Sequence, residues 1–236
     1  MTISVRGVIG VGVLAIVLGS GTGLLRAASV TVDDFSDIGF WAGTGAHEAA
    51  LVLQFPTVAG GTTLEPAAVA WGYRWDGVAT FESLLFALAG HIVGGPAAVA
   101  GSDPRLAIDV SYFGADWGYF VNEIAYDQTG LGTGWSPGVR TIGPYDPDTG
   151  EYPAQYQRDD SGGVWTTAPF DLSAAGISTT TLIPGGWYAF VQADGSAATL
   201  SLSQPVSPVP EPSAIALAVG GAIAAWAVAA RRRKRG

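Results

Sequence analysis

Residues 69–90 read VAWGYRWDGVATFESLLFALAG, and the spacing of the apolar side chains changes within them. In the first part, bulky side chains occupy every second position: Val69, Trp71, Tyr73 and Trp75. The same alternation runs from Leu106 to Tyr112. Strict alternation is typical of a half-buried β-strand. The sequence therefore predicts two strands, at residues 69–75 and 106–112.

The second part of this stretch has the spacing of a helix. Its apolar side chains fall at i, i+3, i+4 and i+7: Phe81, Leu84, Leu85 and Leu88. Thr80 is placed to cap the start of the helix, and Gly90 is placed to end it. We expect one amphipathic helix, over about residues 80–90, to pack on a sheet.

Other short apolar runs predict further strands: Ala50–Phe55, Gly118–Tyr126, Gly163–Thr167, Trp187–Ala193 and Thr199–Leu202. Clusters of turn residues predict connections: Gly94–Gly95, Gly130–Gly134 and Tyr145–Tyr156. Turn residues between short period-two runs are typical of a sheet-rich fold. The predicted fold class is α+β, a β-dominated single globular domain over residues 28–203.

The aromatic strand at residues 69–75 has two interpretations. Its aromatic side chains and Arg74 could line a binding site. We favour the alternative, in which Trp71, Tyr73 and Trp75 pack beneath the helix and Arg74 pairs with a nearby acidic residue.

Between residues 28 and 207 the chain is strongly acidic. This region has four arginines, no lysine and nineteen acidic residues, a formal net charge of −15, against −9 for the whole chain. Such a charge argues against nucleic acid or an anionic membrane surface as a partner, since binding either depends on Lys and Arg. The chain has no cysteine. Packing rather than disulfide bonds must therefore stabilise the domain.

The N-terminal residues 1–27 have the layout of a secretory signal peptide. Arg6 supplies a positive charge, an apolar segment follows from Val8 to Leu18, and Leu25-Arg26-Ala27 forms a cleavage site after Ala27. An uncleaved anchor is the alternative, because nineteen uncharged residues separate Arg6 from Arg26.

The C-terminal residues 213–230 are long enough to cross a membrane. They hold eighteen residues without a charge, and such a run is about 27 Å long as a helix. Five basic residues follow: Arg231, Arg232, Arg233, Lys234 and Arg235. The positive-inside rule places residues 231–236 in the cytoplasm and everything before Pro210 outside. Residues 204–212 form an extended, Pro-rich linker at the membrane boundary.

This linker contains the motif Val209-Pro210-Glu211-Pro212. The order of Pro-Glu-Pro, apolar helix and Arg-rich end resembles the PEP-CTERM sorting domain of Gram-negative bacteria that make exopolysaccharide. The resemblance covers about residues 208–236 only. It implies that an exosortase, a membrane-embedded processing enzyme, recognises Pro210–Pro212 and cleaves nearby. The protein would pass from an inner-membrane intermediate to the cell surface or the extracellular matrix. A plain single-span anchor is the alternative.

Catalytic motifs are scarce in this sequence. It has two histidines, His47 and His91, and no Gly-x-Ser-x-Gly elbow. His47-Glu48 lacks the second histidine of a zinc-binding helix. Two pairs of adjacent carboxylates could in principle serve a glycosidase: Asp33 with Asp34, and Asp159 with Asp160. We favour the interpretation that they belong to a solvated acidic surface. We expect no catalytic site.

The best candidate for a metal site is the run from Asp146 to Glu151. Asp146, Asp148 and Glu151 offer the hard oxygen ligands that calcium prefers. The run lacks the glycine position and the distal glutamate of a twelve-residue calcium loop. An ordinary turn is the favoured interpretation, and calcium is kept as a hypothesis.

Two functions follow from these observations. The first is a non-enzymatic surface or matrix protein that is sorted by an exosortase and associated with exopolysaccharide. The second is a carbohydrate- or other ligand-binding module, in which exposed tryptophans stack on sugar rings. Burial of the tryptophans discriminates between the two, because a structural protein buries them and a glycan-binding protein exposes two or three on one face.

Overall fold

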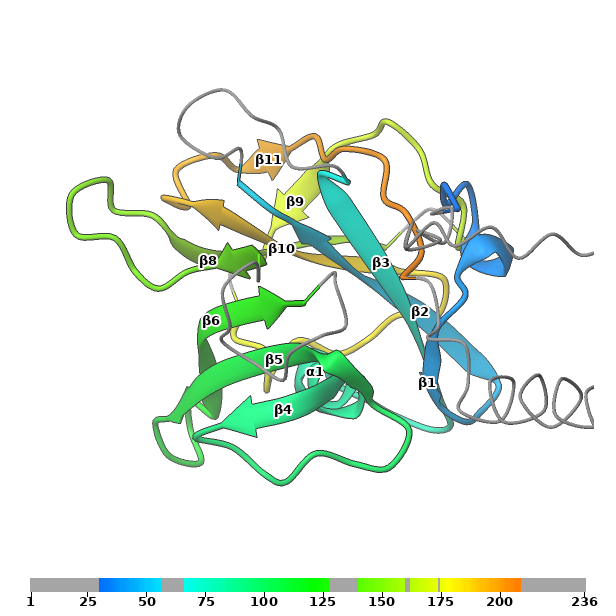
Figure 1. The fold of residues 1–236 in the computed structure, drawn as a ribbon, viewed down its shortest axis with the longest axis horizontal. Helices are drawn as coiled ribbons and strands as arrows, with labels where there is room; N and C mark the ends of the chain where they lie inside the picture. The colour runs from blue at the N-terminus through cyan, green and yellow to red at the C-terminus, as the bar shows by residue number, and fades with distance from the viewer. Residues whose placement is uncertain (1–29, 57–65, 128–139, 160–161, 174, 209–236) are drawn as a thin grey trace, which may run out of the picture.

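The computed structural model describes residues 30–56, 66–127, 140–159, 162–173 and 175–208. Within these residues the fold is β-dominated with one α-helix, which confirms the α+β prediction (Figure 1). The elements are η1 (Phe35–Asp37), β1 (Trp41–Gly43), β2 (His47–Gln54), β3 (Ala68–Trp75), α1 (Phe81–Leu88), β4 (Ala89–Val93), β5 (Asp103–Tyr112), β6 (Tyr119–Tyr126), β7 (Arg140–Ile142), β8 (Tyr152–Arg158), β9 (Phe170–Leu172), β10 (Trp187–Ala193) and β11 (Thr199–Leu200).

The strands form two sheets. The larger has the order β1-β3-β2-β10-β8-β9-β11, and the smaller has the order β4-β5-β6-β7. In the smaller sheet β4 runs parallel to β5, while β5, β6 and β7 are antiparallel. In the larger sheet β1 runs parallel to β3 and β10 parallel to β2, and the other pairs are antiparallel. Helix α1 contacts β1, β3 and β4, and it lies in the lower half of Figure 1.

The central strands of the larger sheet are buried on both faces. On β3, Trp71 belongs to the core cluster that contains α1 and the inner side of the smaller sheet. Its neighbour Ala70 belongs to a second cluster, with Tyr156, Phe170 and Trp187. The prediction of a half-buried strand was therefore wrong for the first part of β3, because the second cluster covers the face expected to meet solvent.

The aromatic strand packs as expected. Trp71 and Trp75 are buried in the cluster that contains α1, and Tyr73 lies partly buried against it. The Arg74 guanidinium pairs with Glu48 at 2.8 Å and lies 4.4 Å from the centre of the Trp41 ring. The packing interpretation is confirmed for this strand.

Helix α1 has the predicted core face and the predicted cap. Its four spaced apolar side chains are buried, and burial stabilises each by about 1.5–3 kcal/mol. The Thr80 hydroxyl accepts a hydrogen bond from the Ser83 N–H at 3.3 Å. The role predicted for Gly90 was wrong, because the helix ends at Leu88 and β4 follows at once. Gly90 instead permits close approach to β5, since a Cβ there would lie 2.4 Å from the Asp103 carbonyl oxygen.

Two other predictions of local structure were wrong. Residues 163–167 form no strand, and three carbonyl groups in and just after this segment, those of Val164, Thr166 and Ala168, accept hydrogen bonds from Arg158. The predicted connection Tyr145–Tyr156 ends in strand β8, which pairs with the whole of β10. Pro153 made this strand hard to predict, because proline is uncommon inside strands. Ala154 and Tyr156 nevertheless keep the period of two and belong to the second core cluster.

The two ends of the described domain are joined to each other. The Ser207 N–H donates to the Val30 carbonyl at 2.8 Å, and the Val32 N–H donates to the Pro205 carbonyl at 3.0 Å. Val206 also pairs with Val69 on β3. Residues 204–208, which the sequence placed in the linker, thus pack on the domain, and Pro208 is buried. We call residues 30–32 and 205–207 the terminal clasp.

The sequence predictions for both ends of the chain lie outside the described residues. They comprise the signal peptide and its Ala27 site, the motif Val209–Pro212, the apolar run 213–230 and the basic residues 231–235. None of the helices in the described part of the chain has the length and apolar character needed to cross a membrane.

Candidate functional site

The hairpin of β5 and β6 carries a group of exposed aromatic side chains. Its loop, residues 113–118, is flanked by aromatic residues on both strands. The exposed fractions are 57% for Tyr112, 61% for Phe113, 67% for Trp117 and 43% for Phe120. The rings of Phe113 and Phe120 meet edge to face, with 5.1 Å between their centres. These exposed rings form a contiguous apolar group, and such groups are more typical of interaction surfaces than single exposed apolar residues are.

The hairpin loop is held in place by two glycines and a neighbouring serine. Gly114 and Gly118 have φ angles of +95° and +68°, which L side chains rarely adopt. The Gly118 N–H donates to the Gly114 carbonyl at 2.8 Å. The next residue, Tyr119, donates its N–H to the Ser178 hydroxyl at 2.8 Å. The loop that carries Trp117 is therefore fixed to the body of the domain on one side.

A β-bulge places polar side chains beside these rings. Between the pairs Asp109–Glu123 and Val110–Val121 the register shifts, so Asn122 is an extra residue on β6. The Asn122 amide donates to the Asp109 carboxylate at 3.3 Å and to the Ser111 hydroxyl at 2.8 Å. Hydrogen-bonding groups thus lie next to Phe113 and Phe120 on one face of the hairpin.

Asp109 and Glu123 are direct cross-strand partners in this sheet. Burial, and then the charge of Asp109, raise the pKa of Glu123 above its ordinary value of 4.5. Like charges that face each other across two strands are destabilising. The face therefore combines aromatic rings with two carboxylates that repel each other.

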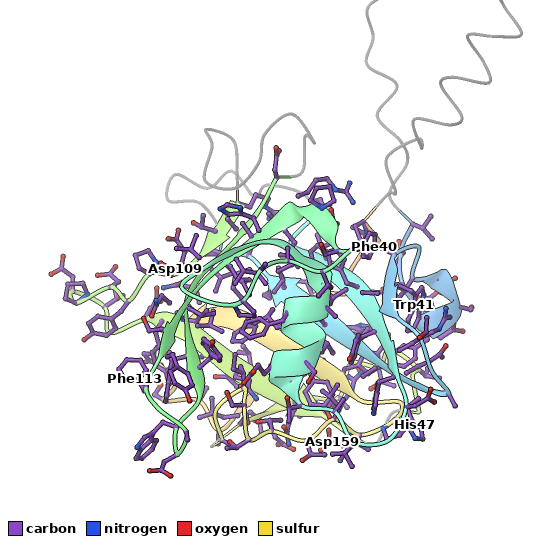
Figure 2. All side chains as sticks on the ribbon, turned by 90° about the horizontal axis from the view of Figure 1, so that it is seen from below. Phe40, Trp41, His47, Asp109, Phe113 and Asp159 are labelled. Carbon is purple, nitrogen blue, oxygen red and sulfur yellow. The ribbon has the colours of Figure 1, made fainter. Side chains whose placement is uncertain are left out.

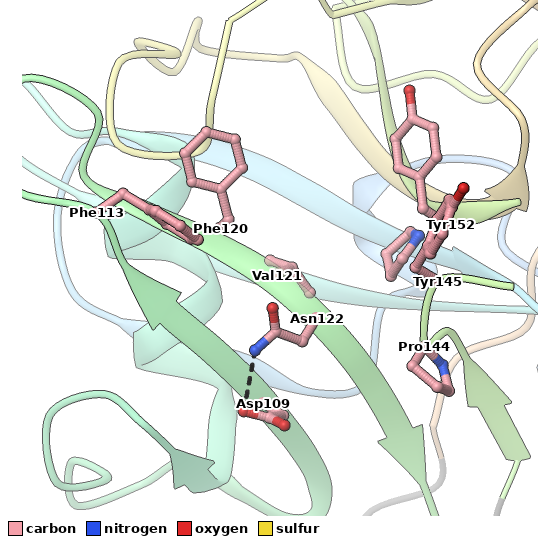
Figure 3. Close-up of a pocket in the computed structure, with 9 residues that line it drawn as sticks. Asp109, Phe113, Phe120, Val121, Asn122, Pro144, Tyr145 and Tyr152 are labelled. Carbon is pink, nitrogen blue, oxygen red and sulfur yellow. Dashed lines mark hydrogen bonds between the residues drawn. The ribbon is translucent and has the colours of Figure 1, made fainter. Parts of the chain in front are cut away.

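A groove runs between this hairpin and the connection from β7 to β8. It has a volume of about 530 Å³ and is open to solvent, and its residues are Asp109, Phe113, Phe120, Val121, Asn122, Pro144, Tyr145, Tyr152 and Pro153. Figure 3 shows Phe113 and Phe120 on one wall and Tyr145 and Tyr152 on the other, with the Asn122–Asp109 hydrogen bond between them. A second hollow of about 390 Å³, lined by Phe113, Trp117 and Phe120, continues the groove toward the hairpin loop. We call the two hollows together the aromatic groove.

The aromatic groove lies far from the terminal clasp. In Figure 1 the loops of the β5–β6 hairpin and of β8 lie at the left, whereas the ends of the described chain lie at the right. Figure 2 gives the same arrangement after a quarter turn, with Phe113 and Asp109 at one side and Phe40 and Trp41 at the other.

Comparison with protein-family models, with curated proteins and with solved structures found no match.

The tryptophans divide unequally between core and surface. Among those described, Trp71, Trp75 and Trp187 are buried, and Trp41 and Trp165 pack against the second core cluster. Trp117 alone of the described tryptophans is largely exposed. The tryptophan count favours a structural role, but phenylalanines and tyrosines supply most of the exposed rings in the groove.

The calcium candidate forms a turn at the edge of the groove. Gly150 donates its N–H to the Asp146 carbonyl at 2.7 Å, and the Asp148 N–H donates to the Asp146 carboxylate at 2.9 Å. Tyr145 and Tyr152, which flank this turn in sequence, line the groove. Within the described ranges, no group of three or more His, Cys, Asp or Glu side chains is placed to hold a metal ion. Calcium binding at Asp146, Asp148 and Glu151 stays a hypothesis.

The other acidic residues singled out from the sequence lie elsewhere. Asp34 caps η1. Hydrogen bonds from the Ser36 hydroxyl and then from the Ser36 N–H, which lies 2.6 Å from the carboxylate, lower the pKa of Asp34. The neighbouring Asp33 accepts a hydrogen bond from Gln204. Asp159 follows β8, and Asp160 lies outside the described residues. The first pair thus serves the local structure at the N-terminal side of the domain.

The sequence carries one signal of the groove, a cluster of aromatic residues around the hairpin loop. Residues 112–120 read YFGADWGYF, with five aromatic residues around two glycines. Apolar alternation breaks here, because Tyr112 and Phe113 are adjacent, as are Tyr119 and Phe120. Adjacent aromatic residues on both arms of a hairpin must place rings on both faces of the sheet.

Proposed function

We propose that this chain is an exported, non-enzymatic protein of the cell surface or extracellular matrix, sorted by an exosortase through residues 208–236. The ordered series of Pro-Glu-Pro, apolar run and basic cluster carries this proposal. The terminal clasp supports it, because a signal peptide and a membrane tail would both leave the domain at one place. Partner classes are the processing enzyme, the membrane and exopolysaccharide.

Replacing Pro210, Glu211 and Pro212 by alanine tests the sorting. The full-length variant is expected to stay in the inner membrane, whereas the wild type is processed. Cell fractionation and mass spectrometry of both chain ends measure this, and cleavage after Ala27 should be the same in both. Processing of the variant at the wild-type rate would refute the proposal.

A second function, carbohydrate binding, is favoured by the aromatic groove. Sugar rings present apolar C–H faces that stack on aromatic rings, and their hydroxyl groups bond to carboxylate, amide and hydroxyl groups. The groove offers both kinds of contact side by side, in Phe113 and Phe120 with Asp109 and Asn122. Its open form suits a polymer better than an enclosed small molecule.

Titration of the full-length protein with soluble β-linked oligosaccharides tests this function. Phe113→Ala and Trp117→Ala should each weaken binding about tenfold, the loss expected for one stacking contact of 1–2 kcal/mol. Val78→Ala is the matched control, because Val78 is 85% exposed and lies between β3 and α1. Equal binding by Phe113→Ala and Val78→Ala would exclude the groove as the binding site.

A further inference from the structure

The charges around the aromatic groove all have one sign. Asp109 and Glu123 face each other on the hairpin, and the turn at residues 146–151 adds three carboxylates beside Tyr145 and Tyr152. Asp116 is exposed in the hairpin loop next to Trp117. A ligand with negative charges would be repelled from this face.

The arginines of the described domain are engaged elsewhere. Arg74 pairs with Glu48, and Arg105 pairs with Asp103 at 2.9 Å. Arg140 lies 4.4 Å from the centre of the Phe55 ring, and Arg158 donates to the Thr166 carbonyl at 2.8 Å. The region contains no lysine. Among the residues that the structure describes, no lysine or arginine lines the groove beside Asp109.

The carboxylate pair is unusual for a sheet. Two like charges on direct cross-strand partners destabilise the folded protein by about 0.2–1 kcal/mol. A shift of register, or an amide side chain in place of one carboxylate, would avoid this repulsion. The Asn122 amide donates to Asp109 at 3.3 Å but brings no positive charge, and violations of local rules are typical of functional sites. A ligand ammonium group between Asp109 and Glu123 would remove the repulsion and make charge-assisted hydrogen bonds.

We infer that the aromatic groove selects a polysaccharide with free amino groups, in which sugar rings stack on Phe113, Trp117 and Phe120. An ammonium group of the polymer binds Asp109, which lines the groove, and the cross-strand partner of Asp109, Glu123. This inference rests on the proposed carbohydrate binding and adds the class of sugar. Charge complementarity identifies the occupant, since a neutral glycan would use the rings and bring no positive charge to the two carboxylates. The continuation of the groove into the second hollow accommodates more than one sugar unit.

Three oligomers of equal length test the inference: β-1,4-linked hexamers of glucosamine, N-acetylglucosamine and glucose. Calorimetric titration of the full-length protein, in detergent and at physiological salt, should show about tenfold tighter binding of the glucosamine hexamer, as expected for one ion pair of about 1.4 kcal/mol. The variant Asp109→Asn/Glu123→Gln should bind all three hexamers alike. Thermal unfolding of this variant checks that it is folded.

A matched control separates the groove from the overall negative charge. Asp171→Asn/Glu82→Gln removes the same charge from β9 and α1, away from the groove. This control should keep the preference for glucosamine. Equal loss in the two double variants would overturn the inference in favour of bulk charge. Equal wild-type binding of the three hexamers would overturn it and leave carbohydrate binding intact, whereas failure of all three to bind would reject both.

Discussion

The two ends of strand β5 surround their carboxylates in opposite ways, one with hydrogen-bond donors and the other with a second carboxylate. At its start, Asp103 is fully buried and its carboxylate accepts hydrogen bonds from Arg105 at 2.9 and 3.0 Å and from the Trp71 indole at 2.9 Å. Near its end, Asp109 faces another carboxylate, Glu123, beside exposed rings. The first arrangement satisfies every requirement of a buried charge. The second lowers stability, and the proposed binding of an ammonium group would offset that cost.

The buried end should respond most strongly to mutation. Asp103→Ala leaves the Arg105 guanidinium buried without its carboxylate, and removal of one partner of such a pair costs about 3–5 kcal/mol. Urea unfolding followed by tryptophan fluorescence measures the change. Asp116→Ala, at an exposed position of the hairpin loop, is the control and should change stability by no more than about 0.5 kcal/mol. If both variants lost a similar amount of stability, the proposed difference between the two ends of β5 would be wrong.

The hairpin loop should respond next. Gly118→Ala forces a left-handed backbone on alanine, which costs about 1–2 kcal/mol. The new Cβ would also lie 2.1 Å from the Ser178 hydroxyl oxygen. Combining Gly118→Ala with Ser178→Gly should recover part of the loss, and a double-mutant cycle from thermal unfolding measures the coupling. Strict additivity would show that the loop does not rest on Ser178.

Mutation at the Asp109–Glu123 end of β5 should change stability least, and it should raise stability rather than lower it. Glu123→Gln removes the repulsion from Asp109 and should stabilise the protein by about 0.2–1 kcal/mol at pH 7. The pKa of Glu123 is raised in the folded protein, so the folded state binds this proton more tightly than the unfolded chain. Wild-type stability should therefore rise relative to the variant as the pH falls through that pKa. The advantage of Glu123→Gln should vanish near pH 4, below the ordinary glutamate pKa.

Unfolding of both proteins at a series of pH values checks this sign. An advantage of the variant that grows toward low pH would contradict it. So would a destabilised variant at pH 7, because that result would mean that ionised Glu123 has a favourable partner in the folded protein.

Regular period predicted the fold where one face of an element meets one core. Helix α1 follows this rule. The strands around Trp71 and Ile108 also lie close to the predicted residues, although β3 is buried on both faces. The rule failed at β8. Pro153 interrupts the pattern there, but the segment still forms a strand because it pairs with β10. The rule also missed the second core cluster, because small residues such as Ala70 give no sign of what packs on them.

The groove could not be predicted from the sequence. Its two walls come from residues 113–122 and 144–153, and they meet only because β6 pairs with β7 and the chain then returns as β8. The facing of Asp109 and Glu123 depends on a bulge, and a register one residue different would separate them. The individual aromatic residues were visible in the sequence, but their common surface was not.

The terminal clasp has a mechanical consequence. If the tail anchors the protein and a polymer fills the groove, any pull on the polymer passes through the whole domain to residues 205–207. These residues are held by backbone hydrogen bonds on two sides, to residues 30–32 and to Ala68 and Ala70 of β3. Several bonds must then yield together before the chain can unravel from its tethered end. These bonds would let the domain resist such a pull at its C-terminal end.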